Sequence, residues 1–377
     1  MKYITIVLWL MAILILTVVS EVSTAGPPAM LVKHIDVHGY LAFSPNGKWL
    51  AVSGVSRSKE CGSTTLLDLS TWNEIPLPSV QEFEASTSNA GPLTWTADSK
   101  NLLVGIVGSD WTGAFMVIAV PQMKVDQAWR SAAVNQNIEQ ICHVAGSKLI
   151  AYIAPCCDTV PIVDFTTGRR IASIQTPQKT QVALCASTMG HFLAIADNDT
   201  LILVEAPNGP VLRTIKLPGQ ISGLAMNDTT HRIAVIYLDE HNIYGRGTST
   251  VWCQVLQTES LERTSGPSIL PGGVAELRGV RFSTAGDRLY LLFNERLARG
   301  DRPVQGDALS YVLVRDSHDL SPVARLGPIP EEGTSIDVSP DGKFVAVSNI
   351  DQISVWLTDR GASSDQSMAG GLDGGGR

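Results

Sequence analysis

Residues 41–53 read LAFSPNGKWLAVS: an apolar stretch, a serine, a turn sequence and a second apolar stretch. Residues 336–348 repeat this pattern near the other end of the chain as IDVSPDGKFVAVS. The Asn46-Gly47 and Asp341-Gly342 dipeptides supply the positive φ values that a tight hairpin needs. Each copy therefore predicts a β-hairpin, and a unit that recurs from end to end indicates a repeat architecture.

Five weaker copies lie between these two. The position of Phe43 is occupied in the other copies by Trp95, His143, Ala186, Met226, Phe282 and Val338. Successive positions lie 40 to 56 residues apart, close to the roughly 40–50 residues of a four-stranded propeller blade. The second stretch of each copy is almost wholly apolar, as in residues 49–52 and 289–292. A strand that is apolar on both faces is covered on both faces, and in a propeller the neighbouring blades cover it.

In these strand–Ser-Pro-(Asn/Asp)-Gly-Lys–strand units, and in the strand Ile353-Ser354-Val355-Trp356, the chain resembles the WD-repeat-like and YVTN-like seven-bladed β-propeller superfamily. The resemblance covers about residues 30–360. It implies an all-β chain folded as a seven-bladed β-propeller.

The last unit, within residues 334–357, has three predicted strands and lacks a fourth. Residues 30–37 precede the first unit and have no blade of their own. We expect them to supply the outer strand of the last blade, because this closure leaves no long unpaired edge. Residues 26–360 are thus predicted to form a single domain, and the Gly/Ser-rich residues 361–377 a disordered tail.

The first 25 residues have the features of a secretory signal peptide: a basic start at Lys2, an apolar run from Ile4 to Val19, and the small residues Ser23-Thr24-Ala25. The apolar run of 16 residues is shorter than the roughly 20 that a spanning helix needs. We expect residues 1–25 to be removed and the propeller to be exported, either to the periplasm or out of the cell. The alternative is an uncleaved N-terminal anchor.

The formal net charge is −8 and the sequence pI about 5.4. Basic residues are scattered, so the electrostatic footprint of a nucleic-acid-binding protein is missing. The six cysteines are Cys61, Cys142, Cys156, Cys157, Cys185 and Cys253. Sequence cannot choose among their pairings.

Alignment of the copies brings two pairs of residues to the same column as Ala42, on inner strands of adjacent blades. Cys142 and Cys185 are either two core thiols or a disulfide near the axis. Arg281 and Asp337 are expected to form an ion pair across the gap between blades six and seven, with a ligand-binding role as the alternative.

Motifs that carry chemistry are missing from the sequence. There is no Gly-x-Ser-x-Gly, His-Glu-x-x-His, Walker-type loop or Cys-x-x-Cys. His34 and His38 are close in sequence but do not suggest a metal site, and His143 is predicted to be a hydrogen-bonded core residue. Asn198 and Asn227 begin glycosylation sequences, which matter in a eukaryotic secretory pathway. We therefore predict no catalytic residue, no metal and no cofactor.

Long connections follow the second strand in blades one, two, five and six, in residues 55–63, 108–113, 239–247 and 294–303. Blade four has only Asn198-Asp199 there. These loops are expected on one face of the disc, and function commonly lies on loops held by a rigid scaffold. The candidate binding residues are Trp111, Tyr244, Arg246, Arg299 and Arg302, of the types that anchor interfaces.

Two functions fit this pattern. The first is a non-catalytic binding scaffold that presents the loop face to a protein or other partner. The second is a propeller enzyme or enzyme subunit, such as a lactonase-like hydrolase or a periplasmic dehydrogenase subunit. An enzyme of this shape should gather polar residues around the axis, whereas the residues aligned with Ala42 are mostly small and uncharged.

The signal sequence gives the first prediction. N-terminal sequencing of the native protein should find a chain that begins near Gly26 outside the cytoplasm. An intact Met1 in a membrane fraction would instead support the anchor, and an intact Met1 in a soluble cytoplasmic fraction would refute export.

Overall fold

The computed structural model describes residues 30–56, 62–77, 89–107, 113–130, 138–154, 158–177, 181–207, 209–239, 250–270, 275–299, 302–349 and 351–358. The predicted signal peptide and the predicted tail lie outside these residues. Among the described residues, no helix has the length and apolar character needed to cross a membrane.

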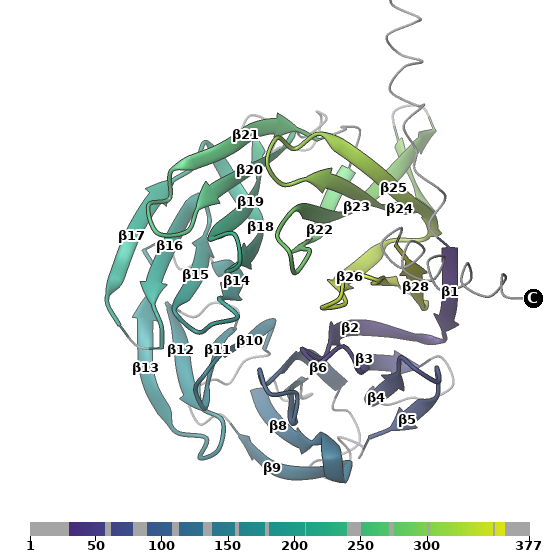
Figure 1. The fold of residues 1–377 in the computed structure, drawn as a ribbon. Helices are drawn as coiled ribbons and strands as arrows, with labels where there is room; N and C mark the ends of the chain where they lie inside the picture. The colour runs from purple at the N-terminus through teal and green to yellow at the C-terminus, as the bar shows by residue number, and fades with distance from the viewer. Residues whose placement is uncertain are drawn as a thin grey trace, which may run out of the picture.

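The described chain forms seven four-stranded antiparallel sheets, arranged as blades around a ring (Figure 1). Blade one contains β2 (Val37–Phe43), β3 (Trp49–Ser56), β4 (Gly62–Asp68) and β5 (Glu74–Pro76). Blade two contains β6 (Asn89–Trp95), β7 (Asn101–Val107), β8 (Gly113–Ala119) and β9 (Lys124–Arg130), with a 3-10 turn, η2 (Val120–Gln122). Blade three contains β10 (Gln140–Val144), β11 (Leu149–Ile153), β12 (Thr159–Asp164) and β13 (Arg170–Gln175).

Blade four contains β14 (Gln181–Ala186), β15 (Phe192–Asp197), β16 (Thr200–Glu205) and β17 (Val211–Lys216). Blade five contains β18 (Gly219–Asn227), β19 (Arg232–Asp239), β20 (Val251–Gln257) and β21 (Arg263–Ile269). Blade six contains β22 (Ala275–Phe282), β23 (Arg288–Arg299), β24 (Arg302–Asp316) and β25 (Pro322–Pro330). Blade seven contains β26 (Gly333–Val338), β27 (Phe344–Asn349), β28 (Ile353–Leu357) and, as its outer strand, β1 (Met30–Ile35). The predicted seven-bladed propeller is confirmed.

A serine or threonine hydroxyl stabilises the first hairpin of blades one, two, six and seven. Ser44 Oγ accepts a hydrogen bond from the backbone N–H of Trp49 (2.9 Å) and donates one to Asn46 Oδ1 (2.8 Å). The equivalent pairs of bonds recur at Thr96, Ser283 and Ser339. One hydroxyl therefore ties the start of the turn to the first residue of the second strand, which favours the hairpin locally.

Positive φ in these turns falls on glycine alone, at Gly47 (68°) and Gly342 (70°). The expectation that each whole dipeptide supplies positive φ was wrong for Asn46 and Asp341. Their side chains instead accept hydrogen bonds from the serine hydroxyl and from a backbone N–H two residues later, at 3.0 Å in both turns. This arrangement needs an ordinary φ at the Asn or Asp.

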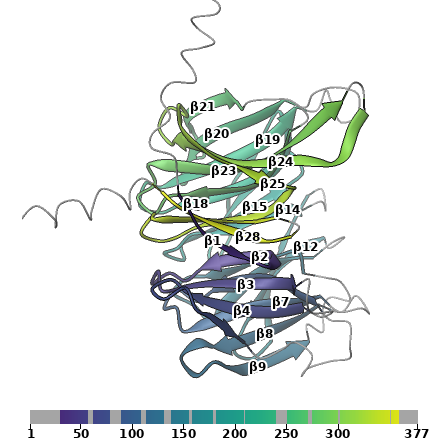
Figure 2. The same ribbon diagram turned by 90° about the vertical axis from the view of Figure 1, so that its right-hand side faces the viewer.

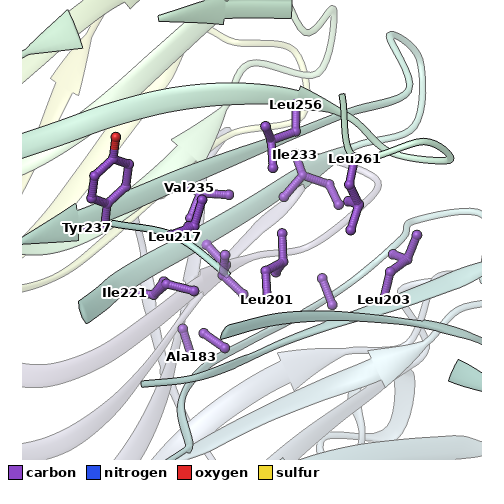
Figure 3. Close-up of a cluster of buried hydrophobic side chains, with 13 residues drawn as sticks. Ala183, Leu201, Leu203, Leu217, Ile221, Ile233, Val235, Tyr237, Leu256 and Leu261 are labelled. Atoms are coloured by element: carbon purple, nitrogen blue, oxygen red, sulfur yellow. The ribbon is translucent and has the colours of Figure 1, made fainter. Parts of the chain in front are cut away.

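The core is divided into seven clusters, each lying between two neighbouring blades. Figure 3 shows the cluster between blades four and five, where Leu201 and Leu203 of β16 face Ile233 and Val235 of β19. All four side chains are fully buried. This confirms that the second and third strands are apolar on both faces because a blade covers each face.

The ring is closed by β1, which pairs antiparallel with β28 from Met30↔Leu357 to Ile35↔Ile353. The first and last coloured segments consequently lie side by side in Figure 1. Ile35 is 3% exposed and belongs to the cluster between blades seven and one, with Ile353 and Val355. The predicted closure by the N-terminal strand is confirmed.

Closure by β1 gives the second prediction. Ile35→Ala should lower the free energy of unfolding by about 2–4 kcal/mol, because it removes buried methyl groups and leaves a cavity in the closing cluster. The matched control is Leu31→Ala on the same strand, where the side chain is 37% exposed and the cost should stay below about 1 kcal/mol. Urea denaturation measures both, and equal costs would show that β1 is not a structural closure.

Candidate binding surface at the mouth of the central channel

The two faces of the disc differ in their connections. The inner strands β2, β6, β10, β14, β18, β22 and β26 all begin at one face, which we call the channel-mouth face. Connections on the opposite face, between first and second or third and fourth strands, are four or five residues long throughout. Connections on the channel-mouth face range from one residue, at position 36, to twelve, at 77–88.

The connections expected to be long belong to the channel-mouth face, but only that of blade five, at 240–250, is long. The expectation was wrong for blades one and two, where strand pairing leaves five residues each, at 57–61 and 108–112. The pairs Val37↔Ser56, Asn89↔Val107 and Gly219↔Asp239 set the ends of β3, β7 and β19 beside the starts of the inner strands. Sequence reasoning missed two further long connections on this face, at 77–88 and 131–139, because it considered only second-to-third connections.

The five candidate binding residues fall in two groups. Trp111, Tyr244 and Arg246 lie outside the described residues. Arg299 ends β23 and Arg302 begins β24, and the two are directly opposite each other in the ladder. The structure thus brings two of the five together at the level of the backbone.

Residues 294–303 are largely β-structure and not the long loop expected from the sequence. Ladder pairing of β23 with β24 extends to Arg299↔Arg302, whereas β22 pairs only as far as Glu295. Because β23 and β24 continue beyond the neighbouring strands, they form a two-stranded ribbon that stands out from the disc (Figure 2). The two arginines therefore belong to a projecting hairpin.

A buried polar network holds the base of this ribbon. Asn294 on β23 donates from Nδ2 to Gly333 O (3.0 Å) and accepts at Oδ1 from the Gly333 N–H (2.9 Å). Ser310 on β24 donates to Asn294 Oδ1 (2.8 Å). Both side chains are completely buried. Satisfied networks of this kind rigidify a structure, so the ribbon leaves the disc at a fixed point.

A hollow of about 190 Å³ lies at the axis, lined by residues of the seven inner strands and their approaches. Its polar side chains include those of Tyr40, Glu139, Ser222, Arg278 and Arg281. The lining of the axis is therefore more polar than the residues aligned with Ala42 suggested. Tyr40 lies two positions before Ala42, and residues two apart on a strand share a face. Aligning the residues two positions before Ala42 in each copy would have identified Tyr40 as a channel residue.

Within the channel, the predicted ion pair between Arg281 and Asp337 is confirmed. Arg281 Nε lies 3.0 Å from Asp337 Oδ1, and Asp337 Oδ2 accepts a hydrogen bond from the Phe43 N–H at 2.7 Å. One carboxylate thus joins blades six, seven and one. Burial raises the pKa of Asp337, and the neighbouring Arg281 opposes this rise.

Cys142 and Cys185 are free thiols in the structure, as is Cys253. Burial raises the pKa of Cys142, and it raises the pKa of Cys185 to about 12. These groups are therefore protonated at neutral pH and poorly nucleophilic. Cys61, Cys156 and Cys157 lie outside the described residues.

The histidine predictions have separate outcomes. The predicted hydrogen bond of His143 is confirmed, since its Nε2 donates to Ser147 O at 3.0 Å. Its ring lies 5.8 Å from that of Phe165, but the residue is half-buried and does not belong to the core. Burial lowers the pKa of His143. His34 lies 3.3 Å from Ser354 Oγ through Nδ1. In the described part of the chain, no three His, Cys, Asp or Glu side chains are arranged to hold a metal ion.

The glycosylation sequence at Asn227 has a structural use. Its Nδ2, the atom that would carry a glycan, donates to the backbone oxygens of Ser283 and Thr284 at 3.0 Å. Asn227 is 7% exposed and connects blades five and six. A glycan on this atom is incompatible with the folded ring.

Comparison with known proteins supports the architecture. No family model and no curated protein matches the sequence. The crystal structure of the Myceliophteria thermophila Cps50 (Swd1) beta-propeller domain superposes with a TM-score of 0.64 at 15% identity, covering 88% of this chain and 100% of that one. The chain folds as a seven-bladed β-propeller, and this solved propeller domain shares the fold.

A chain in the crystal structure of a mitotic checkpoint complex is also similar to this propeller. It superposes with a TM-score of 0.61 at 11% identity, covering 89% of this chain and 92% of that one. At such identities the likeness concerns the fold alone.

The Asp337 carboxylate gives the third prediction. Asp337→Ala should destabilise the propeller by about 2 kcal/mol or more, because it leaves Arg281 and the Phe43 N–H without their acceptor. Asp337→Asn keeps a side-chain oxygen for the Phe43 N–H and should cost less. Urea denaturation of the two variants measures the difference, and equal costs would show that the Phe43 bond contributes nothing.

The raised pKa of Asp337 also predicts how the stability of the folded protein depends on pH. A group with a folded pKa above its unfolded value adds stability at low pH, and this contribution is lost as the pH rises through the folded pKa. The stability of the wild type relative to Asp337→Asn should therefore fall as the pH rises from about 3.5 to neutrality. A relative stability that rises over that range would mean that Arg281 outweighs burial.

Proposed function

We propose that this protein is an exported, non-catalytic scaffold that binds a protein partner through its channel-mouth face. The observation that carries the proposal is the asymmetry of the disc. All connections of the opposite face are four or five residues long, whereas the channel-mouth face carries connections of one to twelve residues and the β23–β24 ribbon. Such variation on a fixed scaffold is typical of surfaces that acquire a partner.

The fold supports this role. Seven buried clusters hold the blades, so loops can vary without loss of core. The buried Asn294–Ser310–Gly333 network fixes the ribbon that carries Arg299 and Arg302. A pre-organised element loses less entropy on binding than a mobile one. One of the similar structures is a propeller domain, and the other is a chain of a checkpoint complex. This chain need not share the partners of either protein.

The polar hollow at the axis favours a second candidate, a propeller enzyme or enzyme subunit. Tyr40 and Glu139 are the lining residues there whose side chains could act as a general acid or base. Against this role, Arg281 is held in an ion pair with Asp337, and Arg278 lies 4.0 Å from Glu332. These charges stabilise the ring. Steady turnover of a lactone or an amine by the purified propeller would establish the enzyme and refute the scaffold.

The binding face gives the fourth prediction. The double substitution Trp111→Ala with Tyr244→Ala should weaken capture of the native partner, because interface anchors typically contribute about 2 kcal/mol or more each. The melting temperature should hardly change, since both residues lie in connections. The measurement is quantitative affinity capture from native extract, followed by calorimetric titration of the captured partner.

The matched control is Met189→Ala. Met189 is an apolar residue with 62% exposure in a turn of the opposite face. It should leave capture unchanged. Undiminished capture by the double variant, or an equal loss with Met189→Ala, would place the binding surface elsewhere.

A further inference from the structure

Two arginines lie directly opposite each other on the ribbon of blade six. Arg299 ends β23, Arg302 begins β24, and the two residues are partners in the ladder. Pairing of β22 with β23 stops at Glu295, and pairing of β25 with β24 stops at Leu309, so neither neighbouring strand of the blade flanks this end of the ribbon. The two arginines are therefore placed beyond the disc, on the channel-mouth side (Figure 2).

This pairing of like charges is unfavourable by itself. Residues directly opposite each other in an antiparallel pair share a face, with Cβ atoms about 4.5–5.5 Å apart, and like charges in such positions destabilise the pair. Arginine also keeps its charge at every physiological pH. An anion bound between the two residues would offset their repulsion, so the pair favours an anionic ligand.

The ribbon is basic, although the chain as a whole is acidic. Residues 296–307 contain three arginines and two aspartates, a formal charge of +1, whereas the whole chain carries −8. Glu295, at the base of the ribbon, lies 3.4 Å from Arg325 Nη2, and Arg325 Cζ lies 3.5 Å from the centre of the Tyr311 ring. The carboxylate at the base of the ribbon thus already has a cationic partner.

We propose that the ribbon binds an acidic segment of the protein partner, with Arg299 and Arg302 as the carboxylate-binding residues. This inference rests on the proposed function and names the chemistry of the partner. A guanidinium matches a carboxylate in a bidentate geometry. The buried network of Asn294, Ser310 and Gly333 holds the base of the ribbon, so the two arginines are presented with little loss of entropy on binding.

Two other anionic partners fit the structure less well. A nucleic acid would meet a chain of net charge −8 whose basic residues are scattered. An anionic membrane would have to approach the channel-mouth face. However, Met30 at the start of β1 pairs with Leu357 at the end of β28, so both ends of the described chain lie at the opposite face. An anchor formed by the residues before Met30 would therefore leave from the face away from the ribbon.

The probe is a fluorescently labelled hexaglutamate peptide, titrated against the purified native protein and followed by fluorescence anisotropy. Hexaglutamine is the neutral control, and hexaglutamate should bind about tenfold more tightly or better. Raising the ionic strength from about 0.02 M to about 0.2 M should weaken this binding, because salt screens exposed charges. Labelled octathymidylate and phosphatidylserine vesicles test the other two partners, and tighter binding of either than of hexaglutamate would overturn the proposal.

Three double variants test the two arginines. Arg299→Gln with Arg302→Gln should weaken hexaglutamate binding about tenfold or more, because it removes both charged donors. Arg299→Lys with Arg302→Lys keeps the charges but loses the bidentate geometry, and should weaken binding about threefold. The matched control, Arg169→Gln with Arg170→Gln, removes two adjacent exposed arginines from the opposite face and should leave binding unchanged. Thermal melts check that every variant folds.

Equal binding of the two peptides by the wild type would overturn the proposal, as would undiminished binding by the glutamine variant of the ribbon. An equal loss in the control at Arg169 and Arg170 would show that net charge alone is responsible. The titration needs no native partner. If the native extract yields no partner although hexaglutamate binds the ribbon, the proposed function fails. If a partner is captured through Trp111 and Tyr244 but hexaglutamate does not bind, only the present inference fails.

Discussion

Closure of the ring is the constraint on which the rest of this structure depends. Each blade is apolar on both faces, so a blade without a neighbour would expose an entire cluster to water. The chain meets this requirement by placing its first described strand, β1, on the edge of its last sheet. Two hydrogen bonds reinforce the same seam, from Phe43 N–H to Asp337 and from Gly39 N–H to Ser348 Oγ (2.9 Å). No covalent bond between the described residues joins the two ends.

Rigidity of the disc has a consequence for where binding can evolve. The hairpin turns of the opposite face are fixed by the serine or threonine bonds and by contacts between blades, such as the donation from Asn46 N–H to Ser99 Oγ at 3.0 Å. Altering their length would break these bonds. The connections of the channel-mouth face differ widely in length. The ribbon of blade six is the most extended element on that face.

Polar residues at the axis fall into two groups, those that pair with one another and those that do not. Arg281 and Asp337 neutralise each other and connect the last blades to the first. Tyr40, Glu139 and Ser222 have no such structural partners among the described residues, and they surround a hollow.

The sequence by itself determined the architecture of this protein. The repeated hairpin, the apolar second strands and the spare segment before the first repeat were enough to predict seven blades and closure by residues 30–37, because these features are local or periodic. Column alignment also predicted the pairing of Arg281 with Asp337. Only the tertiary structure decided that residues 294–303 form a ribbon, and that Tyr40, Glu139 and Ser222 share one hollow. Residues from blades one, three and five meet through the curvature of the ring, which leaves no periodic trace in the sequence.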